Sequence, residues 1–341
     1  MHLLPSPELN DRELISGNSQ LSATVGVAVP VVIRDAGPDA IRRFVEFFTA
    51  NIRNPNTRSA YMRASRRFCT WAERHKVPLS QVEPVLVAAY VEELCKQYAD
   101  LSVKQHLAAI RMLFDYLVTG GILRANPAAS VKGPRVVIAK GKTPILSAGE
   151  ARRLLDSIDV TTITGLRDRA VIALMVHTFA RVGATLKMRV EDVRLSDRRY
   201  WVRLHEKGGR HHEMPLHHNA ETYLMEYMDA AGLHPEEFDE QTEQPATPLF
   251  RNIGRRRYLT PNPMHRNDAL RMIKRRAVAA GVSPQICSHT FRATGITEYM
   301  RNGGTLEKAQ QMAAHASSQT TQMYNRVSDT VTLDEVERVL I

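Results

Sequence analysis

Six side chains of the kind that can break and rejoin a phosphodiester bond occur in a fixed order along the chain. Covalent cleavage of such a bond needs a nucleophile, a base for its proton, cations for the non-bridging oxygens and an acid for the leaving oxygen. The candidates for these tasks are Arg181, Lys207, His289, Arg292, His315 and Tyr324. Together they indicate attack on phosphorus without a metal ion or ATP.

Tyr324 is the candidate nucleophile, because a phenol esterified to phosphate conserves the energy of the broken bond for rejoining. A phenol is ordinarily protonated at neutral pH, so it needs a base or a cationic field. His289 suits the base, since histidine ordinarily titrates near ~6.5. Arg181 and Arg292 can each offer paired N–H donors to phosphoryl oxygens, a geometry that lysine lacks.

Lys207 lies in a glycine-flanked turn, from which a flexible ammonium could protonate the departing 5′-oxygen. His315 would add a donor to the same phosphate. Each residue alone has an ordinary explanation, such as packing for the tyrosine, a solvated hairpin tip for the lysine or the helix dipole for Arg181. The ordered combination favours chemistry, because unrelated explanations would have to coincide at suitable spacings.

The charge balance favours an anionic partner. The 341 residues include 46 Lys and Arg against 36 Asp and Glu, a net charge of +10, and the pI is near 9.7. Such a surplus attracts nucleic acid through long-range attraction and counterion release. The basic residues gather in two stretches, an acid-free one between Asp115 and Glu150 and a second one from Arg251 to Arg276. We predict that both stretches contact phosphates. The candidate DNA-binding residues are Arg124, Lys132, Arg135, Lys140, Lys142, Arg255, Arg256, Arg257, Lys274 and Arg275.

Several other classes of protein are disfavoured. The three widely spaced cysteines argue against a disulfide framework or a zinc module. No signal-peptide pattern or apolar run of membrane-spanning length is present. The pairs His211-His212 and His217-His218 are interpreted as phosphate-facing or solvated, since neighbours on a strand point to opposite sides and no carboxylate or cysteine joins them. We expect a cytoplasmic protein with no cofactor, no metal and no membrane contact.

Patterning divides the chain into five segments. The first residues lack steady periodicity and predict a flexible arm with a short strand around residues 25–33. Apolar residues at helical spacing then predict a compact helical domain, followed by prolines and glycines that mark a linker. The predicted segments are an arm (1–36), a helical DNA-binding domain (37–124), a basic linker (125–146), a catalytic domain (147–328) and an amphipathic tail (329–341).

Local signals predict where elements begin and end. Capping-box patterns at Ser102 and at Ser147 predict two helix starts. The helix from Ser102 should stop at Gly120. Aromatic and β-branched residues predict a strand at 200–204, and residues 213–216 should form the return strand of a hairpin around the candidate lysine. The second domain is therefore expected to be mostly helical with a small sheet.

Four segments resemble the tyrosine recombinase, or phage-type integrase, family. Residues 178–183 (Thr-Phe-Ala-Arg-Val-Gly) resemble its first arginine box and residues 206–208 its β-hairpin lysine. Residues 288–294 resemble its H-x-x-R box, and residues 313–324 resemble its closing tyrosine box. The resemblance covers residues from about 38 to 330, and the last two boxes are highly specific.

The resemblance implies a mainly α fold, with an all-helical, SAM-like core-binding domain and an α+β catalytic domain that carries a small antiparallel sheet. It implies a site-specific DNA recombinase that works through a 3′-phosphotyrosine intermediate and a Holliday junction. It also implies a homo-tetramer on two double-stranded DNA sites. The tail would dock on its own domain or, as the family implies, on a neighbouring protomer.

The chain departs from the family pattern at three places. Ala184 stands where the family commonly has Glu, so a supporting interaction of the first arginine is replaced. Ala313-Ala314 stands where Leu-Gly is common, and His212 where Arg is often found. None of these departures removes a chemical group from the set. Two other functions remain as alternatives. Type IB topoisomerase-like nicking and sealing shares this chemistry, and a non-catalytic DNA-binding regulator would keep the fold but have no use for the tyrosine.

Overall fold

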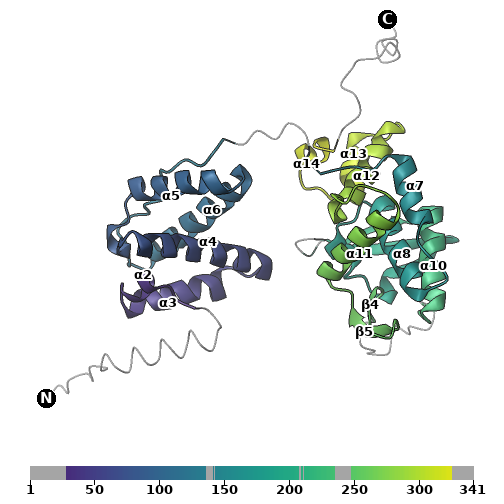
Figure 1. The fold of residues 1–341 in the computed structure, drawn as a ribbon, viewed down its shortest axis with the longest axis horizontal. Helices are drawn as coiled ribbons and strands as arrows, with labels where there is room; N and C mark the ends of the chain where they lie inside the picture. The colour runs from purple at the N-terminus through teal and green to yellow at the C-terminus, as the bar shows by residue number, and fades with distance from the viewer. Residues whose placement is uncertain are drawn as a thin grey trace, which may run out of the picture. The chain divides into compact units, whose positions relative to one another are not determined.

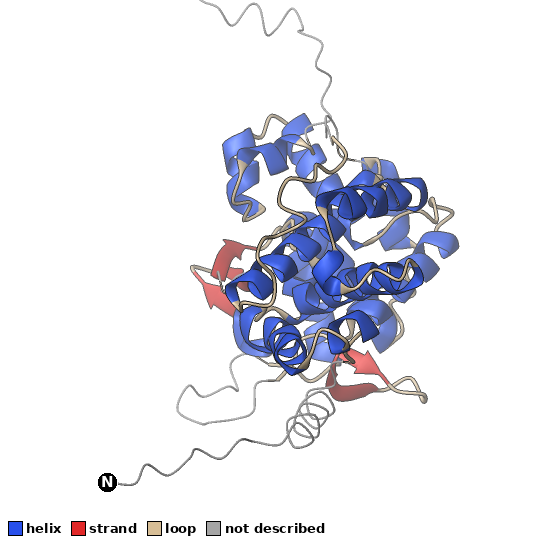
Figure 2. Ribbon diagram, turned by 90° about the vertical axis from the view of Figure 1, so that its left-hand side faces the viewer, coloured by secondary structure: helices blue, strands red, loops and turns tan. Residues whose placement is uncertain are grey.

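The computed structural model describes residues 28–135, 141, 143–206, 209, 211–234 and 247–324. The chain divides into two compact units, Met1–Val137 and Ile138–Ile341 (Figure 1). Helices dominate, and the strands form two small antiparallel sheets, as Figure 2 shows. The predicted fold class, a helical domain followed by a mostly helical domain with little sheet, is confirmed.

The first unit is entirely helical where it is described. Prolines stand in the first turns of α3, α4 and α5, where the missing N–H costs no hydrogen bond, and Asn54 caps α4 through its side chain. Its elements are α2 (Val31–Arg34), α3 (Pro38–Glu46), a π-helical turn (Phe47–Asn51), α4 (Pro55–Arg74), a 3-10 turn (Leu79–Gln81), α5 (Pro84–Gln97) and α6 (Asp100–Thr119).

An aromatic core holds these helices together. Phe44, Phe47 and Phe48 meet edge to face, and Phe68 of α4 meets Phe114 of α6 at 5.5 Å between ring centroids. All five are buried. Edge-to-face aromatic pairs stabilise by about 0.5–1.5 kcal/mol beyond their area burial, so these rings fix α3, α4 and α6 against one another.

Two expectations for the first unit are wrong. No strand forms over described residues 28–33, because Val31–Arg34 make helix α2 and bury Val32 and Ile33 in the core. Residues 31–34, which were expected to belong to the arm, therefore form a helix. Helix α6 begins at Asp100 rather than at Ser102, since the carbonyl of Ala99 already accepts bonds from the next turn. Its end at Gly120 is confirmed.

The start of the expected linker belongs to the first unit. Ala128 and Val131 are buried in its core, and Arg111 of α6 donates to the carbonyls of both residues. This anchoring was hidden in the sequence because the prolines and glycines around it signal only a break in regular structure. Lys140 and Lys142 lie outside the described residues.

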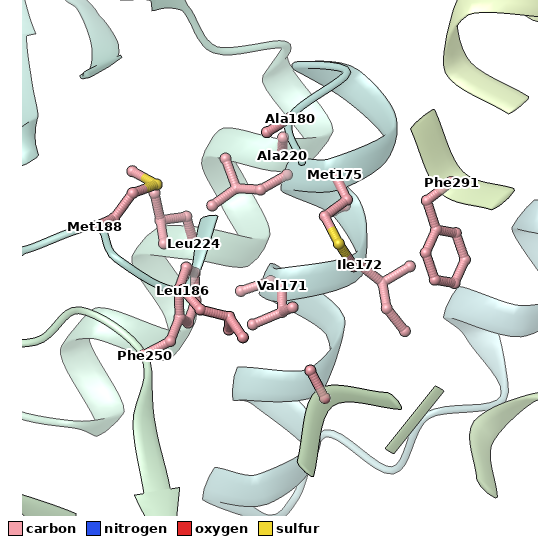
Figure 3. Close-up of a cluster of buried hydrophobic side chains, with 14 of the residues drawn as sticks. Val171, Ile172, Met175, Ala180, Leu186, Met188, Ala220, Leu224, Phe250 and Phe291 are labelled. Carbon is pink, nitrogen blue, oxygen red and sulfur yellow. The ribbon is translucent and has the colours of Figure 1, made fainter. Parts of the chain in front are cut away.

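The second unit places its helices around one central helix. Helix α8 is buried along most of its length, including Val171, Ile172 and Met175, which pack against Phe291 of α12 and Phe250 (Figure 3). The helices are α7 (Ala148–Asp156), α8 (Ile163–His177), α9 (Val182–Thr185), α10 (His218–Ala230), α11 (Arg266–Ala279), α12 (Ser288–Arg301), α13 (Leu306–Met312) and α14 (Ser318–Gln322). The predicted capping box at Ser147 is confirmed at the start of α7.

A buried carboxylate ties α8 to α11. Asp168 is fully buried and accepts bonds from Arg167 at 2.7 Å and from Arg276 at 2.8 Å, with Arg275 at 3.5 Å. An unpaired buried carboxylate would be very costly, so these guanidinium groups are required by the fold. Part of the second basic stretch therefore serves the structure.

The larger sheet carries the predicted hairpin. Its strands are β1 (Val193–Ser196), β2 (Arg199–His205) and β3 (His211–Pro215), in the order β1-β2-β3, all antiparallel, after a 3-10 turn over Val190–Asp192. A second sheet, β4 (Arg251–Ile253) with β5 (Leu259–Pro263), was not predicted. Prolines in β5 remove ladder donors and obscured the strand pattern.

Candidate active site

Arg292 is the centre of the site. It projects from α12 and is 1% exposed. Its Nη1 donates to the Phe179 carbonyl and its Nη2 donates to the Ala313 carbonyl at 2.5 Å. These carbonyls stand two residues before Arg181 and two residues before His315. One guanidinium therefore fixes both loops that carry further candidate residues.

Both of these loops contain a left-handed residue. Phe179 has φ 54° and Ala314 has φ 46°, a region that costs an L-residue about 1–2 kcal/mol. The close approach of α12 to the end of α8 depends on Gly295, where a Cβ would collide with the Val176 carbonyl and the Phe179 ring. Backbone strain of this kind persists where surrounding contacts over-determine it.

Arg181 precedes α9 and forms an ion pair with Glu206. Glu206 follows strand β2 and is buried. The burial of Arg292 lowers its pKa to about 10, with Arg181 adding to the effect and Glu206 opposing it. The Arg292 guanidinium is therefore charged at neutral pH, and Arg181 lies near enough to act on it electrostatically.

Tyr324 lies in the turn after α14 and reaches Arg292. The Tyr324 hydroxyl is near enough to the Arg292 guanidinium to raise its pKa, and the Tyr324 ring stacks nearly parallel to the His315 ring at 5.8 Å between centroids. The Tyr324 carbonyl accepts a bond from Thr297 of α12 at 3.0 Å. The phenol is therefore held beside the Arg292 guanidinium and the neutral His315 ring.

His315 is buried and neutral at physiological pH. Burial lowers its pKa to about 3, helped by Arg292, Arg181 and His289. Its Nδ1 lies 2.9 Å from the Thr321 hydroxyl, itself fully buried. If the hydroxyl donates to Nδ1, the proton of the neutral ring is on Nε2, which then is the donor available to a ligand.

His289 occupies the first turn of α12 on the exposed side of the site. Partial burial of its ring lowers its pKa, and Arg292, Arg181 and Arg266 lower it further. A neutral imidazole can accept a proton, so this environment suits a general base. Lys207 lies outside the described residues, and its position is not part of this geometry.

The strands that flank the lysine turn are anchored. His205 Nε2 lies 2.8 Å from Asp192 Oδ2, and burial lowers the pKa of the half-buried His212, with Glu206 opposing and Arg292 adding to the effect. Sequence reasoning missed Glu206 and Thr321 as partners of candidate residues. Glu206 is adjacent to Lys207 in the sequence, but its partner Arg181 stands 25 positions away, and no local pattern signals such a pairing.

The candidate DNA-binding residues have different surroundings. Lys274 donates to the Pro284 carbonyl, and Arg275 approaches Asp168, so both have structural partners. On the turn between β4 and β5, three of the candidates are exposed: Arg255, Arg256 and Arg257. After α6, three more are exposed: Arg124, Lys132 and Arg135.

A basic groove on the first unit was also missed. It has a volume of about 510 Å³ and lies between α4 and α5. Three buried polar atoms at its wall have no hydrogen-bond partner among the described residues: Tyr90 Oη, Arg66 Nε and His106 Nδ1. A helical stripe of arginines was the available signal, and it consists of Arg63, Arg66, Arg67 and Arg74.

The histidine pairs do not form a metal cluster. His217 stacks on His177 at 4.1 Å with an interplanar angle of 9° and meets His218 at 4.0 Å. Within the part of the chain that the structure describes, no three His, Cys, Asp or Glu side chains converge as metal ligands. Burial lowers the pKa of His177 to about 4, so the His177 ring is neutral at physiological pH.

The fold and the site together define a class of enzyme, the tyrosine-type recombinases, which cleave and rejoin DNA strands. Residues 144–330 match the phage integrase family, and residues 41–121 match the N-terminal SAM-like domain of phage integrases. The first match spans more than half of the chain. The chain therefore belongs to the phage integrase family.

Similar proteins include bacterial Xer recombinases. The chain is 25% identical to the tyrosine recombinase XerD of Chlorobaculum tepidum, over 80% of this chain and 86% of the relative. It is 28% identical to the XerC of Myxococcus xanthus, over 75% of this chain and 81% of the relative.

Among the helices that the structure describes, none is long and apolar enough to cross a bilayer.

Solved structures share the fold. XerH bound to a palindromic difH substrate in a post-cleavage complex gives a TM-score of 0.65 at 17% identity, covering 98% of this chain and 97% of that one. A lambda integrase tetramer bound to a Holliday junction gives 0.63 at 16% identity, covering 93% and 88%. At these identities the likeness concerns the fold.

Proposed function

We propose that the chain exchanges strands between two specific DNA sites through a covalent 3′-phosphotyrosine bond at Tyr324. The observation that carries this proposal is the contact of the Tyr324 phenol with the buried Arg292, beside the Arg181–Glu206 ion pair. A nucleophile and two phosphate-binding forks meet in one place, as covalent phosphoryl transfer requires.

The reaction needs no external energy source. The Tyr324 oxygen attacks phosphorus and His289 accepts the phenolic proton, while the bond from phosphorus to the 5′-oxygen breaks. Lys207 protonates that oxygen, so the products are a phosphotyrosine and a free 5′-hydroxyl. The 5′-hydroxyl of the partner strand then attacks the phosphotyrosine and releases Tyr324. One phosphodiester is broken and one is formed, which retains the bond energy.

Arg181, Arg292 and His315 stabilise the charge that develops on the non-bridging oxygens. The arginines contribute full charges, whereas His315 contributes a neutral N–H donor, since its pKa is lowered to about 3. Removing one preorganised donor of this kind typically costs ~10²–10³ in rate. We assign the six residues to catalysis on this basis, with Lys207 assigned from its motif.

The proposed partner is double-stranded DNA, bound by both units. The groove between α4 and α5, with the exposed cations of the β4–β5 turn and of the segment after α6, would contact phosphates. Exchange between two sites requires four active sites, so we propose a homo-tetramer. The lambda integrase tetramer on a Holliday junction supports this stoichiometry for the fold. Tail residues 329–341 lie outside the described residues.

The nucleophile is tested with DNA nicked near the cleavage position, from which the short fragment diffuses away and traps the adduct. DNA recovered from the purified protein would supply the site. Tyr324→Phe should bind this DNA normally and form no covalent adduct. Tyr258→Phe, an exposed tyrosine in the β4–β5 turn, is the matched control and should form the adduct. An adduct that persists in Tyr324→Phe would disprove the assignment.

A second assay separates recombination from topoisomerase-like activity. A supercoiled plasmid with one site is compared with a plasmid with two sites. Recombination predicts deletion or inversion products only with two sites. Relaxation of the one-site plasmid without recombinant products from the two-site plasmid would contradict the proposed function.

A further inference from the structure

Arg181 has a buried carboxylate partner beside the proposed phosphate site. Its Nη1 donates to Oε2 of Glu206. The Glu206 side chain is 4% exposed, whereas that of Arg181 is 33% exposed. One edge of the guanidinium is therefore fixed inside the protein, and the remaining N–H groups are left for a ligand.

A carboxylate in this position opposes phosphate binding unless it has a compensating role. Burying it is costly, and its charge repels an incoming phosphodiester. Helix α9, which starts directly after Arg181, has the sequence Val-Gly-Ala-Thr and contains no acidic residue. Ala184, one turn beyond Arg181, is buried. Support for Arg181 therefore comes from the end of a strand 25 positions away.

We propose that Glu206 is a positioning residue for Arg181. It fixes the plane of the guanidinium so that the free N–H groups face the phosphoryl oxygens before DNA binds. A long side chain that is already ordered loses less conformational entropy when it binds its ligand. Glu206 also reduces the repulsion between Arg181 and Arg292, which would otherwise drive the two cations apart. This inference rests on the proposed role of Arg181.

A different role for Glu206 can be separated chemically. Glu206 immediately precedes Lys207, so its loss could instead disturb protonation of the leaving 5′-oxygen. A substrate with sulfur in place of that bridging oxygen distinguishes the two roles. The Tyr324 oxygen again bonds to phosphorus, but the bond that breaks joins phosphorus to sulfur. The departing thiolate needs no proton, because thiols are far more acidic than alcohols.

The experiment measures single-turnover cleavage of the ordinary and the sulfur-bridged substrates. Glu206→Gln should slow both by roughly tenfold, because a neutral hydrogen bond is about half as strong as a charge-assisted one. Glu206→Ala should slow both by roughly 10²-fold, as expected for a misplaced binding group. Lys207→Ala should cleave the ordinary substrate slowly, and its cleavage rate should return toward that of the wild type on the sulfur-bridged substrate. DNA affinity in a Tyr324→Phe background should change little.

Glu213→Gln is the matched control, since Glu213 forms an exposed ion pair with Arg203 on the same hairpin at 2.6 Å. It should cleave like the wild type. Thermal unfolding shows whether the variants fold, and the isosteric Glu206→Gln is the variant expected to keep the fold. Cleavage by the Glu206 variants at the wild-type rate, or recovery on the sulfur-bridged substrate, would overturn the inference. A wild-type protein that forms no adduct would overturn the proposed function as well.

Discussion

At the scale of single residues, Arg292 does two tasks that are usually assigned to different side chains. It holds the carbonyls of Phe179 and Ala313 and also contacts Tyr324. A guanidinium has five N–H donors in a rigid fork, so the structural bonds leave donors for a phosphate. We therefore propose that Arg292 serves the shape of the site as well as its charge.

We expect Arg292→Lys to fail in both tasks. An ammonium cannot reach two carbonyls in fixed directions, and a buried carbonyl left without a donor costs about 1–3 kcal/mol. The free energy of unfolding of the variant should be lower by about 3 kcal/mol, and the adduct should form at least ~10²-fold more slowly. Denaturant unfolding and adduct kinetics measure the two losses. The control is Arg203→Lys, on strand β2 and paired with Glu213, which should keep both normal stability and the normal rate of adduct formation. Normal stability of Arg292→Lys would show that Arg292 does not hold the two carbonyls.

The depressed pKa of His315 predicts a stability loss in acid. In the unfolded chain a histidine takes up its proton near pH ~6.5, whereas His315 in the folded protein does so only near pH 3. As the pH falls below ~6.5 the unfolded state binds more protons, so stability falls by about 1.4 kcal/mol per pH unit until about pH 3. His315→Gln should remove the contribution of one proton, about 1.4 kcal/mol per pH unit, from the slope of unfolding free energy against pH. An unchanged slope between pH 6 and 4 would show that His315 is charged in the folded protein.

At the scale of elements, the sequence predicted what local pattern determines. The buried face of α6, the end of that helix at Gly120, the capping box at Ser147 and the β2–β3 hairpin are all set by neighbours within a few residues. The missed features depend on distant partners. Helix α2 is stabilised by the burial of Val32 and Ile33 in the core. The buried charge of Glu206 is stabilised by its ion pair with Arg181.

The loop before His315 offers a test at this scale. Ala314 has φ 46°, at the position where the family commonly has glycine. Relief of an αL penalty of about 1–2 kcal/mol, less the extra entropy of a glycine in the unfolded chain of about 0.5–1 kcal/mol, predicts that Ala314→Gly stabilises the protein by about 0.5–1 kcal/mol. Thermal and denaturant unfolding measure the change.

The neighbouring alanine is the control. Ala313 has φ −79° and is fully buried, so a glycine gains nothing there and Ala313→Gly should destabilise by about 1 kcal/mol. Equal effects of the two substitutions would show that the left-handed backbone at Ala314 carries no strain.

At the scale of the whole molecule, some cations hold the fold and others remain exposed for the proposed contacts with DNA. Net charge and basic stretches predicted an anionic partner, but sequence alone could not separate the two uses. Arg276 and Arg167 bind the buried Asp168, whereas Arg255, Arg256 and Arg257 stay exposed. The distinction depends on a carboxylate buried in α8, 108 residues from the Arg276 side chain with which it pairs in α11.

The groove of the first unit gives the prediction for the whole molecule. Arg63 and Arg67 are exposed at its edge, and Arg67 lies 4.7 Å from the Tyr98 ring centroid. If each neutralises one DNA phosphate, Arg63→Gln/Arg67→Gln should weaken binding at low salt. It should also reduce the slope of log affinity against log salt by roughly 1.8, at about 0.9 per contact.

Arg42→Gln is the matched control, because Arg42 is an exposed arginine of α3 that pairs with Asp39 away from the groove. Binding of the Tyr324→Phe protein to site-containing and random duplexes should be measured at several salt concentrations. Since phosphate contacts carry no sequence information, the double variant should lose affinity for both duplexes alike. A salt slope equal to that of Arg42→Gln would remove the groove from the DNA interface, and a loss confined to the specific site would show that these arginines read bases.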